Sequence, residues 1–256
     1  MNHPVASREE WLAARKALLA KEKEWTRLRD ELNAERRALP WVRIDKGYWF
    51  EGPDGRMTLS DLFAGRSQLI VKHFMLGPGW ADPCVGCSFE SDHLDGMIVH
   101  LENHDVSFVA VSRAPYPEIA ATHRRMGWRS RWVSSHGSDF NYDFNVSFTP
   151  EQITAGQATY NYQEGAAPIE EMSGRSIFCK DEAGAVFHTY SSFARGGEVV
   201  LGAYALLDMT PKGRRESIRG NLTDWVRLHD RYDAGDHADT GGRMYPAAGE
   251  DGGGCR

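Results

Sequence analysis

The chain has 256 residues, of which 41% are hydrophobic and 26% are charged, so it can bury a core and is typical of a globular protein. Its formal net charge of -6 argues against a nucleic-acid partner. No run reaches the ~20 apolar residues of a membrane span, so no membrane partner is expected either. Four cysteines are too few for a disulfide framework, and the first residues lack the apolar core of a signal peptide. Together these features favour the cytoplasm.

Residues 1–40 are predicted to form a helical extension. Ser7 and Glu10 make a capping box, and Pro40 ends the helix. Large apolar residues recur every seven positions, at Trp11, Leu18, Trp25, Leu32 and Leu39. Such a stripe needs a surface to cover. We expect the helix to lie as a strap across its own domain, which the narrow stripe favours, or to make a homodimer contact.

Residues 41–232 are predicted to form the main domain. A strand over 41–50 is followed by a turn at Pro53-Asp54-Gly55 and by a short helix over 57–65. An apolar strand over 68–76 then leads through a Gly/Pro loop to two cysteines, Cys84 and Cys87, in a C-x-x-C motif. Apolar residues at helical spacing continue from Phe89 to Leu101. This order of strand, turn, dithiol and helix is a redox signature.

The physical setting favours chemistry at Cys84. A cysteine in the first turn of a helix faces unpaired backbone N–H groups and the positive end of the helix dipole, and both stabilise the thiolate. Cys87 lies on the same helix face, within reach of a disulfide. We therefore assign attack to Cys84, which is expected to be the exposed cysteine, and resolution to Cys87. Asp82 opposes this effect, because a nearby carboxylate disfavours a thiolate.

Two other interpretations of the cysteine pair are a structural pair and half of a zinc site. A zinc site needs about four ligands. No second C-x-x-C is present, Cys179 and Cys255 are isolated, and His73 and His93 have no recognisable ligand spacing. We therefore expect neither a metal nor a cofactor. Lys72, in the strand before the motif, could tune the dithiol or could pair with a carboxylate.

In the rest of the main domain, predicted strands and helices continue to alternate. A strand over 106–112 and a helix over 115–127 imply parallel neighbours in an α/β fold. An insertion is expected near 128–171. Within it, the aromatic residues of 128–148 could line a substrate groove or pack on the core. A β-hairpin over 176–190 follows, with Cys179 as a small buried hydrophobe, and a closing helix spans 221–232. Residues 233–256, which include Cys255, are expected to be a disordered tail.

The centre of the chain resembles the thioredoxin-like superfamily, in its peroxiredoxin and cytochrome-maturation branches. The resemblance rests on the Asp-Gly turn at Asp54 and Gly55, on Leu59-Ser-Asp-Leu62 with Gly65, and on Cys84 and Cys87. It implies a mixed sheet flanked by helices. It also makes Arg175 a candidate site residue, because peroxiredoxins carry an arginine at a similar place that helps to hold the thiolate.

The whole chain is similar to a bacterial group of thioredoxin-like proteins, domain-of-unknown-function family 899, predicted to be dithiol-disulfide oxidoreductases. The similarity rests on the N-terminal helix, Cys84-Val-Gly-Cys87 and four later segments. Those segments are Ser138-Asp-Phe-Asn141, Phe187-His-Thr-Tyr-Ser191, Arg195-Gly196 and Leu207-Asp208. His188 lies inside one of them, and the sequence assigns it no role.

Three functions are compatible with these observations. The leading hypothesis is a thiol-disulfide oxidoreductase that acts on a disulfide-bearing protein or a small thiol substrate through Cys84 and Cys87. A thiol peroxidase is less favoured, because Ala81 stands where peroxiredoxins place a Thr or Ser, three residues before the attacking cysteine. The third is a non-enzymatic scaffold that binds a partner through the N-terminal helix and the aromatic loop.

Overall fold

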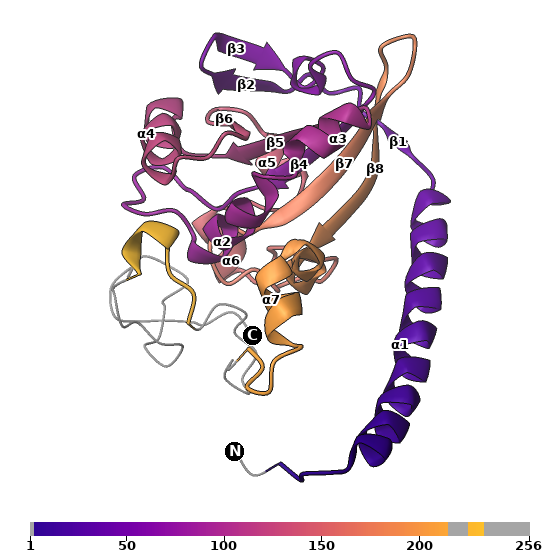
Figure 1. The fold of residues 1–256 in the computed structure, drawn as a ribbon. Coiled ribbons are helices and arrows are strands. Elements are labelled where there is room, and N and C mark those ends of the chain that lie inside the picture. Colours follow the sequence, from indigo (N-terminus) through magenta and orange to yellow (C-terminus); the bar gives the residue numbers. More distant parts are fainter. Residues whose placement is uncertain (1–2, 215–224, 233–256) are drawn as a thin grey trace. The chain divides into compact units, whose positions relative to one another are not determined.

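The computed structural model describes residues 3–214 and 225–232 (Figure 1). The chain divides into two compact units, Met1–Trp41 and Val42–Arg256, and each is described by itself. The predicted tail over 233–256 and residues 221–224 of the predicted closing helix lie outside the described residues. Within the described part, no helix is both long and apolar enough to cross a membrane.

The first unit is one helix, α1 (Arg8–Arg37). The predicted capping box is confirmed: the Glu10 backbone N–H donates to the Ser7 side chain, and the Glu10 carboxylate accepts from the Ser7 backbone. Arg36 and Arg37 lie in the last turn, where positive charge complements the helix dipole. Nothing within this unit tests the role of the apolar stripe, so the strap and the homodimer contact both stay predictions.

The second unit is built on one mixed sheet of eight strands in the order β1-β8-β7-β4-β5-β6-β2-β3. The strands are β1 (Val42–Arg43), β2 (Trp49–Gly52), β3 (Gly55–Thr58), β4 (Gln68–His73), β5 (Val106–Ser112), β6 (Arg131–Ser134), β7 (Gly174–Lys180) and β8 (Val186–Phe193). Strands β4, β5 and β6 are parallel neighbours, whereas β7 runs antiparallel to both β4 and β8. Figure 1 shows β7 and β8 as a long curved hairpin.

Short helices connect the strands or follow the last one. They are η1 (Asp61–Phe63), α2 (Val85–Leu94), α3 (Ile98–Asn103), α4 (Tyr116–Met126), α5 (Phe140–Asp143), α6 (Pro150–Thr154), η2 (Ala194–Val200), α7 (Gly202–Leu207) and η3 (His229–Arg231). Helix α4 ends at Gly127, whose positive φ of 67° is the left-handed conformation that commonly closes a helix. The predicted helix over 115–127 is thereby confirmed.

The order of β4, α2, β5, β7 and β8 confirms the thioredoxin-like fold. In this core the first strand lies in the middle, its parallel partner follows through a helical crossover, and an antiparallel hairpin completes the opposite side. Here β4 is the middle strand, β5 its parallel partner and β7–β8 the hairpin. The dithiol therefore lies where β4 passes into α2, as the resemblance implied.

Several predicted elements have other bounds in the structure. The predicted strand over 41–50 is two short strands, β1 and β2, which pair with different parts of the sheet. The predicted helix over 57–65 is reduced to η1, because residues 55–58 join the β2–β3 hairpin. The helix after Cys84 breaks at residues 95–97 into α2 and α3. In the described part of the closing helix, 225–232, only η3 is helical.

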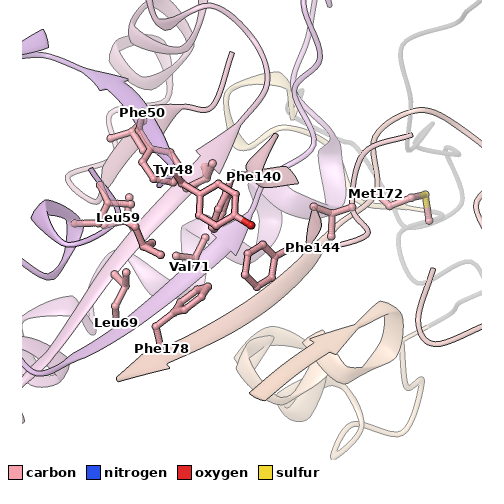
Figure 2. Close-up of a cluster of buried hydrophobic side chains, with 14 of the residues drawn as sticks. Tyr48, Phe50, Leu59, Leu69, Val71, Phe140, Phe144, Met172 and Phe178 are labelled. Atoms are coloured by element: carbon pink, nitrogen blue, oxygen red, sulfur yellow. The ribbon is translucent and has the colours of Figure 1, made fainter. Parts of the chain in front are cut away.

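The largest buried cluster lies on one face of the sheet (Figure 2). Leu69 and Val71 of β4 and Phe178 of β7 meet two rings from the 128–148 region, Phe140 and Phe144. The ring centroids of Phe140 and Phe144 are 4.7 Å apart, and Phe144 lies edge-on to Phe178 at 5.3 Å. Of the two predicted roles for this aromatic region, packing on the core is the one that these two rings have.

Phe140 gives a test of this packing. Its side chain is fully buried and also makes edge-to-face contacts with Tyr48 and Phe50, at 5.1 and 4.9 Å between centroids. Phe140→Ala is expected to lower the free energy of unfolding by about 3–5 kcal/mol, because it removes the ring and leaves a cavity. Urea denaturation at equilibrium measures this loss. A loss below about 1 kcal/mol would be close to the effect of a surface substitution and would contradict the burial of Phe140 in this cluster.

Candidate active site

The two cysteines of the motif lie at the start of α2. Cys84 is the N-cap, and its Sγ accepts the backbone N–H of Cys87 at 3.4 Å. The Cys87 Sγ in turn accepts the backbone N–H of Met75 at 3.5 Å. Backbone bonds from Cys84 N to Met75 O and from Ser88 N to Cys84 O fix the turn. The two sulfurs are thus held at a helix N-terminus, where N–H groups favour negative charge.

Both cysteines are buried, with exposures of 2% each. The sequence-based expectation that Cys84 would be the exposed member of the pair is therefore wrong for this conformation. The reason is that the cysteines belong to an apolar cluster with Phe74, Met75 and Leu228. Leu228, 2% exposed, comes from the last described segment of the chain and belongs to the same cluster.

Residues 225–232 form what we call the C-terminal clasp. Val226 and Leu228 are buried, and η3 contacts α2. Arg231 makes a bidentate ion pair with Asp82, with Nη–Oδ distances of 2.5 and 2.9 Å. Asp82 lies two residues before Cys84. The clasp also pairs His229 with Asp92 of α2, at 2.6 Å from Nδ1 to Oδ1. The clasp is held against α2 and the loop before it by its buried apolar side chains and by the contacts of His229 and Arg231.

The two thiols share one negative charge. Burial by itself would raise the pKa of Cys87, but the hydrogen bond from the Cys84 thiol and the positive charge of Lys72 outweigh burial and lower that pKa to about 7. For Cys84, the hydrogen bond to Cys87 and burial raise the pKa well above its ordinary value. The predicted lowering at Cys84 is therefore found at Cys87. In the reduced pair, a Cys84 thiol donates to a Cys87 thiolate.

Three buried charges lie beside the pair. Lys72 of β4, 2% exposed, donates from Nζ to Oε2 of Glu90 at 2.6 Å. Arg175 of β7, 9% exposed, pairs with Oε1 of the same carboxylate at 2.6 Å. The Arg175 guanidinium also donates to the backbone carbonyls of Gly196 and Gly197. Of the two predicted readings for Lys72, pairing with a carboxylate is seen directly, and its charge also acts on the thiols.

The other residues singled out in the sequence lie outside this group. The His73 and His188 side chains join a chain of hydrogen bonds through Ser176 and Ser191, each 2.8 Å long, on the aromatic face of the sheet. Burial, with the nearby charges of Lys72 and His188, lowers the pKa of His73 to about 3, so it is neutral. Cys179 is only half-buried, which corrects the expectation of a buried residue. Cys255 lies outside the described residues.

No metal centre emerges from these positions. His93 bonds instead to the backbone, with Nδ1 at 2.6 Å from the Phe89 carbonyl and Nε2 accepting the Ala203 N–H. Among the described residues, no three side chains of the histidine, cysteine, aspartate or glutamate type lie together as ligands. The cysteine pair is thus accompanied by buried charges rather than by further ligands.

Glu90 is the site residue that sequence reasoning missed. It lies one turn after Cys87 on α2, within Ser88-Phe89-Glu90-Ser91. A signal did exist: Glu90 is three residues after Cys87, so the two share a helix face, and a lysine interrupts the strand that packs under that face. A buried lysine requires a partner, and this carboxylate is the acid that the helix offers there.

Fold and site together define a thioredoxin-like protein with a dithiol at the N-terminus of the helix that follows the middle strand. The chain belongs to the family described as "Bacterial protein of unknown function (DUF899)", whose profile matches residues 1–232. A comparison with curated proteins gives no match.

Similar solved structures include peroxidoxin BcpB from Mycobacterium tuberculosis, 14% identical, with a TM-score of 0.42 over 64% of this chain and 97% of that one. Another is the mitochondrial 2-Cys peroxiredoxin from Plasmodium falciparum, 15% identical, with a TM-score of 0.38 over 65% of this chain and 91% of that one.

Proposed function

We propose that the protein is a thiol-disulfide oxidoreductase that uses Cys84 and Cys87. The observation that carries the proposal is the geometry of the buried pair: Cys84 is the N-cap of α2, and the backbone N–H of Cys87 donates to the Cys84 sulfur at 3.4 Å. A pKa of about 7 leaves about half of the pairs anionic at neutral pH, whereas a free cysteine with a pKa of ~8.5 is mostly protonated there. This is the state needed for disulfide exchange.

The reaction follows from the hydrogen bond between the two sulfurs. The proton moves from the Cys84 sulfur to the Cys87 sulfur, and the Cys84 thiolate attacks one sulfur of a substrate disulfide. The S–S bond breaks and the second substrate sulfur leaves as a thiolate, which takes up a proton. Cys87 then loses its proton and attacks the Cys84 sulfur, which releases the other substrate thiol. Two protein thiols are oxidised to a disulfide, and one substrate disulfide is reduced to two thiols.

The substrate we propose is a disulfide-bearing protein or a small disulfide or thiol, acted on in the cytoplasm. The N-terminal helix could place two copies of the chain together as a homodimer, and that contact is proposed separately from the chemistry. Both cysteines are buried in a cluster that includes Leu228 of the clasp, and we propose that the clasp moves to admit the substrate.

Insulin reduction with dithiothreitol as the electron donor tests the proposal. The wild type is expected to accelerate precipitation of the insulin B chain above the dithiothreitol background, and Cys84→Ser is expected to match the background. The rate with the wild type should rise as the pH passes through about 7 and level off above it, because the thiolate of the pair forms there. A wild type at background would overturn the proposal, and rapid sulfenate formation with hydrogen peroxide would favour a peroxidase.

A further inference from the structure

The ion group beneath the dithiol carries a surplus positive charge. Lys72 and Arg175 stand directly opposite each other in the antiparallel β4–β7 pair, a position in which two like charges repel. One carboxylate, Glu90, lies between them and contacts both at 2.6 Å. The group thus contains two cations and one anion. Among the ion pairs of the described residues, neither cation has a second carboxylate.

The position of this group places its charge next to the sulfurs. Side chains alternate along β4, so Val71 and His73 join the aromatic face while Lys72 points to the opposite face, where it meets Glu90 of α2. Glu90 follows Cys87 by one turn on the same face of that helix. Met75, three residues after Lys72, binds the Cys87 sulfur through its backbone. Lys72 and Cys87 are therefore enclosed between the same strand end and the same helix.

The other charged groups around the motif pair among themselves. Asp82 pairs with Arg125 and Arg231, and Asp92 pairs with His229. In η2, which packs against α2, Glu198 pairs with Arg195 and Arg214. None of these pairs includes Lys72, Glu90 or Arg175. The anion left to balance the surplus charge is the thiolate of the reduced cysteine pair.

We propose that Lys72, Glu90 and Arg175 are positioning residues whose surplus positive charge stabilises the negative charge of the reduced dithiol. This inference rests on the proposed function and concerns the residues that set the reduction potential of the Cys84–Cys87 pair. Burying three charged side chains below 10% exposure costs folding free energy. In other proteins, replacing such a buried ion group with apolar residues often leaves the stability unchanged or raises it. Here the triad favours the reduced pair over the disulfide, which carries no charge. A protein with this feature is a stronger oxidant than one without it.

Counting charges gives the test. The triad of the wild type has a net charge of +1, because Lys72 and Arg175 face one Glu90. Lys72→Met brings the net charge to zero, Glu90→Gln brings it to about +2, and the double variant returns it to about +1 with Arg175 alone. The matched variant Lys72→Arg keeps the charge. A triad that only held the fold together would give no such order, since both single variants would simply destabilise the protein.

Thiolate absorbance against pH reads the dithiol without any reagent that must enter the site. Lys72→Met is expected to raise the pKa of the first thiol by about one unit, Glu90→Gln to lower it, and the double variant and Lys72→Arg to stay near the wild type. Equilibration with glutathione is expected to show the matching order. A tenfold change in the equilibrium constant corresponds to about 30 mV, towards a more negative potential in Lys72→Met.

These measurements test the role of the triad and the proposed function separately. Equal pKa values and equal glutathione equilibria in all four variants would overturn the role of the triad, as would shifts of the same sign in Lys72→Met and Glu90→Gln. If Lys72→Met does not fold, the isosteric Glu90→Gln variant still tests the sign by itself. A wild type that forms no Cys84–Cys87 disulfide with glutathione would overturn the proposed function instead, so the two failures can be told apart.

Discussion

Cys87→Ser is expected to trap the protein as a mixed disulfide through Cys84. The variant keeps a nucleophile at the helix N-terminus but lacks the sulfur that resolves the intermediate, which lies three residues away on the same face. An intramolecular thiol competes at a far higher effective concentration than a free one, so the adduct should persist at least about 100-fold longer than in the wild type. Intact-mass spectrometry after a brief exposure to an aromatic disulfide measures the adduct.

The matched variant, Cys84→Ser, settles which sulfur attacks. Cys87 has the lower pKa in the reduced pair, so two assignments compete: Cys87 attacks directly, or Cys87 takes the proton of Cys84. The second assignment predicts a stable adduct in Cys87→Ser and none in Cys84→Ser. The reverse pattern would reverse the roles of the two cysteines. No adduct in either variant, with both folded, would exclude disulfide exchange at this motif.

The local part of the site could be predicted from the sequence. The strand before the motif, the Gly/Pro loop and the helical spacing after Cys87 all act within one short segment, so the position of the cysteines at a helix start follows from neighbouring residues alone. The capping box of α1 is local in the same sense. Such features depend on contacts between residues three or four apart, which the order of the sequence states directly.

The parts that could not be predicted depend on distant partners. In β6, Trp132 and Val133 are flanked by Arg131 and Ser134, a pattern too short and polar to indicate a strand. It becomes one only because β5 offers a free parallel edge. Helical spacing and the nearby Lys72 indicate Glu90 as a partner, but its burial comes from the packing of α2 on β4 and β7. Burial of a charge is thus a tertiary property, decided by what the fold places opposite it.

The burial of the dithiol has the same origin, and it changes what the motif can do. From its sequence, Cys84 begins a helix beside a loop of glycine and proline, which favours exposure. The clasp adds Leu228 to the cluster of the cysteines and ties itself to Asp82. We expect the reactivity of this dithiol to depend on two quantities, the fraction of thiolate and the fraction of molecules with the clasp open. In the proposal the triad affects the first quantity, and we expect the clasp to affect the second.

Releasing the clasp is expected to expose the cysteines without unfolding the domain. Leu228→Ala removes most of a side chain in the buried cluster of the cysteines, and Arg231→Ala removes both bonds to Asp82. If opening becomes easier by about 2 kcal/mol, the low end of the range for Leu→Ala at a buried site, the open population rises about 30-fold. The alkylation rate of the reduced wild type and variants with iodoacetamide at one pH measures it, because alkylation follows the open population when the clasp recloses quickly.

The ion pair makes the clasp sensitive to acid. Burial would raise the pKa of Asp82, but Arg231 and Arg125 outweigh it and hold that pKa below its usual range. Because the pKa is lowered in the fold, the pair contributes stability above the ordinary aspartate pKa and loses it as the pH falls through the lowered value. At neutral pH the clasp therefore keeps this bond, and a faster alkylation in Arg231→Ala at neutral pH reflects the lost side chain rather than protonation of Asp82.

Two control variants separate clasp opening from other routes to the sulfurs. Phe140→Ala weakens the opposite face of the sheet, far from Leu228 in the packing, and lowers the stability of the whole domain. If Phe140→Ala accelerates alkylation as much as Leu228→Ala does, the cysteines are reached only by global unfolding and the clasp has no role. Arg129→Ala removes an exposed ion pair with Asp95 and should leave the rate unchanged. A fast rate in Leu228→Ala and Arg231→Ala alone would show that the last described residues of the chain control entry to the dithiol.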